Sequence, residues 1–411
     1  MKLLIRYYIN YIRLFFKSLK PQYYLNQTAI VNELNSLSYG FNSGSFKTNS
    51  FFILLRLVKK RNYNLNQLFV RSSFDLVTKD FNVKEIKKII RWLIKKNPND
   101  AFNHFALGMA YEHEKKYKLS FDSYLISLEQ DKENIVIIFR LWNLAYQKKV
   151  NIDPNIFVNK LKKIPKIDYK EYSSKVFLKN TNQDFKKILV SQQNCIMVIR
   201  NFFDVKDIGP LRSEVINFTN KFDYTKYETA SFHQANNKLK KLIFNLENLI
   251  FKQLIFKISN FKKFKPIPNP AWWIQKMLYL KKPHSRPNGV GTKLHQDNPI
   301  YSRSNEWYTC WIPLTDANLK KGFSSLMFLP YKTSLPIPIR DFDDRRINSI
   351  EYRNFDLFFR KFTTNITAKP GDIIVFGRNM IHSTSINSKS VNTRYSIDLR
   401  WELGSNCSNK I

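Results

Sequence analysis

Two kinds of hydrophobic pattern divide the chain. Between residues 50 and 150, apolar side chains recur at three- and four-residue spacing in stretches such as FFILLRLVKK, VKEIKKIIRWLIKKNP and AFNHFALGMAYEHEKKY. That spacing predicts amphipathic α-helices. From Ala271 onward, short β-rich runs alternate with segments that contain Pro, Asn and Gly. Such runs predict a sandwich or barrel rather than a parallel α/β sheet.

The pattern between these regions places the domain boundaries. Residues 151–175 mix Pro, Asp and Lys without clean periodicity and are interpreted as the start of a linker, 151–184. NCIMVIRNFF (194–203) then predicts a strand and VKDIGPLRSEVINFTNKF (205–222) a helix. The predicted fold class is α+β and multidomain: a helical region at 1–150, a linker, a β-barrel with flanking helices at 185–404, and a tail at 405–411.

One helical stretch, residues 101–134, resembles a tetratricopeptide repeat. A plain bundle of helical hairpins remains the alternative, because His104 replaces the usual Trp of the repeat and Lys132 its closing Pro. The positions that carry the resemblance are an L-G-x-x-Y motif and the small or aromatic residues that follow it, namely Leu107, Gly108, Tyr111, Ser120, Tyr124 and Ser127.

Composition narrows the class of protein. The formal net charge of +36 suggests nucleic-acid binding, but the basic residues are scattered singly or in pairs, among abundant Asn and Ile. No arginine-rich block or recognition module appears, so an A/T-rich genome explains the charge better and nucleic acid is an unlikely partner. The three cysteines form no CxxC pair. A reducing, cytoplasmic compartment is therefore favoured.

The first 20 residues, MKLLIRYYINYIRLFFKSLK, are apolar but interrupted by a basic stripe. Each arginine of a membrane span would cost about 2.5–3.5 kcal/mol at the bilayer centre, and no cleavage site follows. We expect a helix that packs on its neighbours; peripheral contact with a membrane surface is the alternative.

The candidate chemistry begins at KLHQDNPIY, residues 293–301, in a chain that has only six histidines. If Leu294–Asp297 is extended, His295 and Asp297 point to the same face. One imidazole and one carboxylate could be two ligands of a metal site, and a strand end before an Asn-Pro turn is the alternative interpretation.

A third ligand is available in KPGDIIVFGRNMIHSTSIN, where His382 opens a predicted strand. In a double-stranded β-helix, or jelly-roll, that strand would lie beside the one that carries His295. Two histidines and one carboxylate leave three coordination positions open, which suits non-haem Fe(II) and dioxygen chemistry. His284 lies between prolines and lacks a strand context.

The last predicted strand, VNTRYSIDLRWEL, has a charged face. Alternation puts Arg394, Ser396, Asp398 and Arg400 on one side and apolar residues on the other. A barrel interior that holds an anionic cosubstrate would explain this face, because guanidinium pairs bidentately with carboxylate.

The order of these motifs resembles the Fe(II)/2-oxoglutarate dioxygenases, and among them the phytanoyl-CoA dioxygenase family, over about residues 185–404. The resemblance implies that His295, Asp297 and His382 ligate iron and that Arg394 binds 2-oxoglutarate. Met277 and Trp311 match positions that line this cosubstrate. One departure is that Pro330, Tyr331 and Lys332 stand where the family usually has a Gly-Ser-His turn.

The resemblance also implies Fe(II), 2-oxoglutarate and O2 as the reactants, and hydroxylation of a C–H bond with release of succinate and CO2. The alternative is a catalytically inactive barrel in a helical-repeat interaction protein. No residue identifies the substrate, which we expect to be a small or carrier-bound molecule. A protein partner could bind through residues 50–150.

Overall fold

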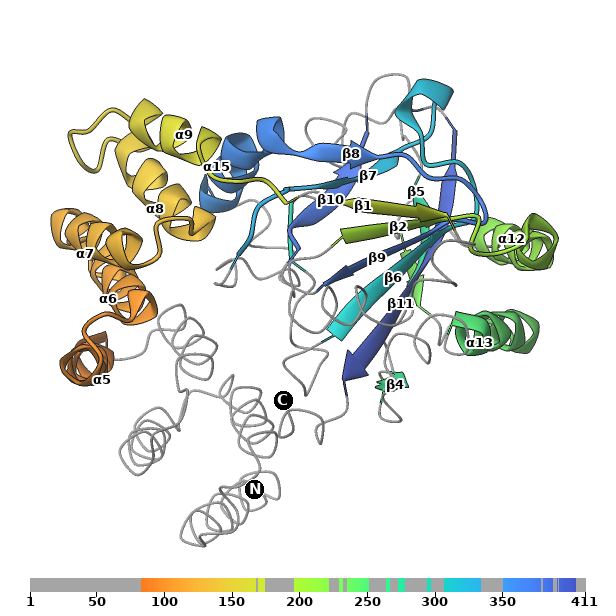
Figure 1. Cartoon of the computed structure of the whole chain (residues 1–411), viewed down its shortest axis with the longest axis horizontal. Helices are drawn as coiled ribbons and strands as arrows, with labels where there is room; N and C mark the ends of the chain where they lie inside the picture. The colour runs from red at the N-terminus through yellow and green to blue at the C-terminus, as the bar shows by residue number, and fades with distance from the viewer. Residues whose placement is uncertain are drawn as a thin grey trace, which may run out of the picture. The chain divides into compact units, whose positions relative to one another are not determined.

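The structure is a computed structural model that divides into two compact units, Met1–Lys162 and Lys163–Ile411 (Figure 1). Among the described residues, no helix is long and apolar enough to cross a membrane. The predicted helix at 1–20, His284 and Asp297 lie outside them. The residues that the structure describes are 83–167, 169–173, 196–221, 229–231, 235–250, 264–266, 273–277, 294–296, 307–333, 350–377, 380–386, 390 and 392–403.

The described part of the first unit is helical, as the periodicity predicts. Each helix packs against the next one along the chain. Asp100 and Asn134 accept backbone N–H bonds at the starts of α6 and α8, and so stabilise both helix ends. The helices are α5 (Val83–Lys96), α6 (Ala101–His113), α7 (Tyr117–Gln130), α8 (Ile135–Tyr146) and α9 (Asn155–Lys162).

Helices α6 and α7 form a close hairpin around Gly108. A Cβ atom at this position would lie 2.5 Å from ring carbons of Tyr124, so only glycine allows the observed packing. The Ser127 hydroxyl donates to the Ala101 carbonyl across the same interface, at 2.6 Å. The positions that suggest a repeat therefore form the helix contact, while assignment to the tetratricopeptide family stays a prediction.

The second unit contains two β-sheets. The larger has the order β1-β2-β9-β6-β11-β5-β3, with β4 also paired to β11, and the smaller has the order β10-β7-β8. Only the β1–β2 pair is parallel among these strands. The strands are β1 (Lys170–Ser173), β2 (Ile196–Arg200), β3 (Thr229–Ser231), β4 (Phe264–Pro266), β5 (Trp273–Met277), β6 (Trp307–Pro313), β7 (Ser325–Phe328), β8 (Thr364–Ile366), β9 (Ile373–Gly377), β10 (His382–Ser385) and β11 (Arg394–Leu403).

Each face of the larger sheet has its own core. Helices α12 (Val205–Asn220) and α13 (Asn237–Ile250) cover one face, where they pack on Tyr395, Ile397 and Leu399 (Figure 1). The opposite face packs on the smaller sheet through a second apolar cluster that includes Trp311 and Phe328. The alternation predicted for β11 is thus confirmed for its described side chains, and its polar face points between the two sheets.

Two short elements lie within the predicted linker at 151–184. Helix α9 begins at Asn155, whose N–H donates to the Asp153 carboxylate at 2.9 Å. Residues 170–173 form β1, an edge strand of the larger sheet. Each element is too short to show a clear period in the sequence.

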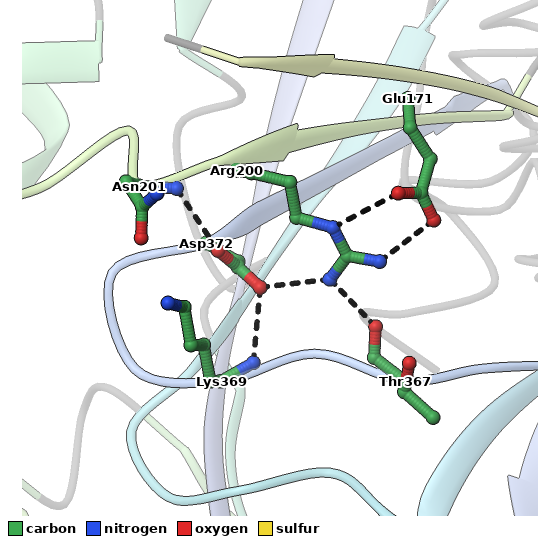
Figure 2. Close-up of polar contacts among 6 residues, drawn as sticks. All are labelled: Glu171, Arg200, Asn201, Thr367, Lys369 and Asp372. Atoms are coloured by element: carbon green, nitrogen blue, oxygen red, sulfur yellow. Dashed lines mark hydrogen bonds and ion pairs between the residues drawn. The ribbon is translucent and has the colours of Figure 1, made fainter.

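An ion-pair network around the buried Asp372 carboxylate, which we call the Asp372 clasp, fixes where β9 begins (Figure 2). The Asp372 carboxylate accepts from Arg200 at 2.8 Å and from the backbone N–H groups of Asn201 and Lys369. Arg200 also pairs bidentately with Glu171 on β1. Burial lowers the pKa of Arg200, but Glu171 and Asp372 outweigh this effect and raise it. The clasp therefore joins β1, β2 and the turn before β9.

Gly371 completes this turn. Its φ of +98° favours glycine, and an added Cβ would lie 2.9 Å from the Phe203 carbonyl oxygen. The Phe203 N–H donates to the Gly371 carbonyl at 2.9 Å. The turn at Gly371 thus anchors the start of β9, the strand that precedes β10 and His382 along the chain.

Candidate active site

The structure brings together the two histidines predicted to bind metal. His295 and His382 form an antiparallel bridge with two backbone hydrogen bonds of 2.8 and 2.9 Å. Their ring centroids are 4.4 Å apart. The predicted neighbouring position of the two residues is therefore observed at this bridge, while the extent of the predicted strand lies outside the described residues.

The orientation of the His382 ring leaves one nitrogen suited to a metal. Its Nδ1 lies 3.0 Å from the Met380 carbonyl oxygen. A carbonyl only accepts hydrogen bonds, so Nδ1 carries the proton and the lone pair of the neutral ring is on Nε2. An imidazole fixed by a carbonyl in this way is typical of metal ligands. The third predicted ligand, Asp297, follows two residues after His295 and lies outside the described residues.

Arg394 supplies a buried positive charge on the opposite sheet. Its side chain has no solvent exposure, and its guanidinium carbon lies 5.0 Å from the ring centroid of Trp311, a cation–π contact. Burial lowers the pKa of Arg394 to about 10, although the Asp398 carboxylate partly opposes this shift. The group therefore remains protonated at neutral pH, and its buried charge favours an anionic ligand.

Two further polar atoms lie in this buried region. Among the residues that the structure describes, the Trp311 indole nitrogen and the Ser396 hydroxyl find no hydrogen-bond partner. Both side chains are almost completely buried, and an unsatisfied buried donor costs free energy. A carboxylate bound at Arg394 could accept from both. The donor set thus fits the distal carboxylate of 2-oxoglutarate.

The histidine pair and this buried region face the same interior between the sheets. The His382 ring lies 4.7 Å from that of Phe376, on β9 of the larger sheet. Phe376 and Trp311 belong to the cluster that joins the two sheets, and the Trp311 ring contacts Arg394. Met277, a predicted cosubstrate residue, is paired in register with Arg394. The apolar side chains of this cluster would limit the access of water to a bound cosubstrate.

Sequence reasoning placed Ser396 on the polar face but gave it no role. It also missed Asp356, which accepts the Leu294 N–H, and Gln296, which donates to the Thr333 hydroxyl. Asp356 lies in FDLFFRKF, and the Asp356–Arg360 pair at i,i+4 in an apolar-periodic run is a recognisable helix signal. Gln296 offered no such signal, because its partner Thr333 is distant in sequence.

One family model matches part of the second unit. The family model "Phytanoyl-CoA dioxygenase (PhyH)" matches residues 197–394, just under half of the chain. No curated protein matches significantly.

Three of the similar solved structures each cover about half of this chain. The α-ketoglutarate-dependent epimerase SnoN from nogalamycin biosynthesis is 12% identical over 53% of this chain and 82% of its own, with a TM-score of 0.37. EctD from S. alaskensis, with 2-oxoglutarate and 5-hydroxyectoine, is 12% identical over 51% and 72%, with a TM-score of 0.35. HygX from Streptomyces hygroscopicus, with nickel and 2-oxoglutarate, is 12% identical over 51% and 82%, with a TM-score of 0.35.

Proposed function

We propose that the second unit is an Fe(II)/2-oxoglutarate-dependent dioxygenase that hydroxylates a C–H bond of a small or carrier-bound substrate. The observation that carries this proposal is the pairing of His295 with His382, two histidines far apart in sequence whose backbones bond to each other. The family match at residues 197–394 and the buried Arg394 support the same conclusion.

The residues of the site would divide the work between metal and cosubstrate. His382, with its Nδ1 proton held by the Met380 carbonyl, would present Nε2 to the metal beside His295 and Asp297. Arg394 would bind the distal carboxylate of 2-oxoglutarate, with Ser396 and Trp311 donating to it. When bound, Fe(II) would supply the oxidising chemistry: O2 and 2-oxoglutarate are consumed, succinate and CO2 are released, and one oxygen atom enters the substrate.

The proposal is tested by anaerobic titration of the full chain with Fe(II) and 2-oxoglutarate. We expect the weak visible charge-transfer band of the chelate, and His382→Ala should abolish it because one ligand is lost. His113→Ala is the matched control, since His113 is an exposed histidine of the helical unit, and it should leave the band unchanged. A band that persists in His382→Ala would show that His382 is not a ligand.

Activity is tested separately. Succinate formation from 2-oxoglutarate should be measured against panels of free metabolites and carrier-linked acyl or aminoacyl groups. Metal binding without turnover on any panel, and without uncoupled succinate, would instead favour an inactive barrel in an interaction protein. The helical unit is the part that we propose contacts a protein partner or a carrier.

A further inference from the structure

Several contacts fix the position of the described residues around His295, 294–296. One is the backbone bridge to His382. Two more contacts are made by the residues on either side of His295. The Leu294 N–H donates to Oδ1 of Asp356 at 3.3 Å, and the Gln296 amide donates to the Thr333 hydroxyl at 2.9 Å.

Asp356 is itself held in one orientation. It lies on α15 (Ile350–Phe359), and Arg360 in the following 3-10 turn (Arg360–Phe362) donates to it twice, both at 2.7 Å. A bidentate guanidinium fixes a carboxylate in both direction and plane. The Oδ1 atom that receives the Leu294 N–H therefore has little freedom to turn away.

The helix that carries Asp356 is anchored by aromatic packing. Phe355, Phe358 and Phe359 are at most 1% exposed, and their rings form a contiguous group with centroid distances of 4.7 Å. Phe362 continues this group to Tyr331, whose ring centroid is 6.5 Å away. Tyr331 lies two residues before Thr333, the partner of Gln296. The same aromatic group thus supports both side-chain contacts to the His295 segment.

We infer that Asp356, held by Arg360, is a positioning residue that sets the affinity of the site for its metal. It does not touch the metal; it fixes the backbone of Leu294, the residue directly before His295. Metal ligands placed loosely bind poorly, and loss of a residue that orients a ligand typically weakens metal affinity about 10- to 100-fold. This inference rests on the proposed metal site, and helix α15 is then part of the site's support rather than an insertion between strands.

The test uses the full-length apo protein, with Co(II) as the probe in equilibrium dialysis. Asp356→Ala should weaken Co(II) binding about tenfold or more. Asp356→Asn keeps an acceptor for the Leu294 N–H but loses the charge that holds Arg360. Its Co(II) affinity should lie between that of the wild type and that of Asp356→Ala. Asp316→Ala is the matched control, since Asp316 pairs with Lys321 at 2.8 Å on the surface of the same unit. It should bind Co(II) like the wild type.

Hydrogen exchange gives a second measurement that needs no metal. The Leu294 amide should exchange faster in apo Asp356→Ala than in apo wild type, with no change in Asp316→Ala. A purely structural role would lower the unfolding midpoint and leave Co(II) affinity unchanged, and that result would overturn the inference. If Asp356→Ala does not fold, the variants Asp356→Asn and Gln296→Leu test the inference instead. Wild-type Co(II) affinity in both of these variants would contradict it.

Failure of the proposed function gives a different result. If the wild type itself binds no Co(II), the metal site is wrong. The exchange measurement on the apo proteins then still decides whether Asp356 fixes the His295 segment: faster exchange in Asp356→Ala supports that role, and equal exchange removes it.

Discussion

At the scale of single residues, Arg394 is the clearest case of a side chain that a stable fold alone would not require. A fully buried guanidinium costs several kcal/mol in desolvation, and here it also depresses the pKa to about 10. The contact with the Trp311 ring and the nearby Asp398 carboxylate both offset part of that cost. An anion bound at the guanidinium would offset more of it.

We therefore predict that Arg394→Leu weakens 2-oxoglutarate binding by about 1.5–3 kcal/mol, roughly 10- to 100-fold, because a charge-assisted bidentate contact is lost. Metal affinity should survive. Isothermal titration with 2-oxoglutarate, at saturating Mn(II), measures the loss. Arg400→Leu, six residues further along β11, serves as the control and should retain 2-oxoglutarate affinity, since the strand separates the two positions by about 20 Å. If Arg400→Leu lost 2-oxoglutarate affinity and Arg394→Leu kept it, the assignment of the cosubstrate to Arg394 would be wrong.

The polar face of β11 could be predicted from the sequence because it depends on a short-range rule. Alternation alone places Arg394, Ser396 and Asp398 on one face, and the two-residue spacing predicts a shared face for His295 and Asp297. Long-range contacts could not be predicted in this way. Nothing in the residues around Leu294 indicates that Asp356 on α15 accepts its N–H. Such contacts follow from where whole elements pack.

At the scale of elements, helix α13 contains a buried acid that the sequence does not explain. Glu247 lies at 6% exposure beside Leu246 and Ile250, and burial raises its pKa from 4.5 to about 7. The protonated form is thus favoured in the folded state. The stability this contributes is present in full below about pH 4.5 and is lost as pH rises through about 7.

Glu247→Gln should accordingly raise the unfolding free energy at pH 8 and change it little at pH 4.5. Complete conversion of the pKa difference would give about 3 kcal/mol, and partial access of solvent reduces the expected gain to about 1–2 kcal/mol. Urea unfolding at the two pH values measures it. Glu214→Gln is the contrast. Lys238 and Asn236 lower the pKa of Glu214, so loss of this carboxylate should destabilise the fold at pH 8. A pH-independent effect of Glu247→Gln would contradict this account.

The Asp372 clasp is the second test at this scale (Figure 2). Asp372→Ala leaves two backbone N–H groups without their acceptor and removes one acceptor of Arg200, which keeps Glu171 and the Thr367 carbonyl. We expect a loss of about 2–3 kcal/mol in unfolding free energy, because polar groups lose their hydrogen-bond partner. Asp316→Ala removes a surface pair with Lys321 and should cost less than about 1 kcal/mol. Equal losses in the two variants would mean that the clasp contributes no more than an exposed ion pair.

At the scale of the whole molecule, sequence patterns separated a helical region from a β-rich one, and the structure divides at Lys162 and Lys163, inside the predicted linker. The start of the β-rich domain at residue 185 was less well predicted. β1 and Ile167 precede it, and both belong to the second unit: the Ile167 N–H donates to the Pro330 carbonyl at 2.7 Å, and its side chain packs on the core between the sheets. Short elements at a domain edge carry too few apolar residues to be recognised by period.

Two truncations test where this unit begins. Residues 163–411 retain β1, Ile167 and the pairing of Glu171 with Arg200, so this fragment should fold, bind Co(II) and form uncoupled succinate like the full chain. Residues 185–411 lack all three and expose the edge of β2, which favours aggregation. We expect the shorter fragment to unfold at a lower temperature or to be insoluble, as measured by differential scanning calorimetry and size-exclusion chromatography.

If both fragments are equally stable and active, β1 is dispensable and residue 185 is the correct boundary. If fragment 163–411 binds Co(II) but forms no succinate while the full chain does, the helical unit contributes to catalysis.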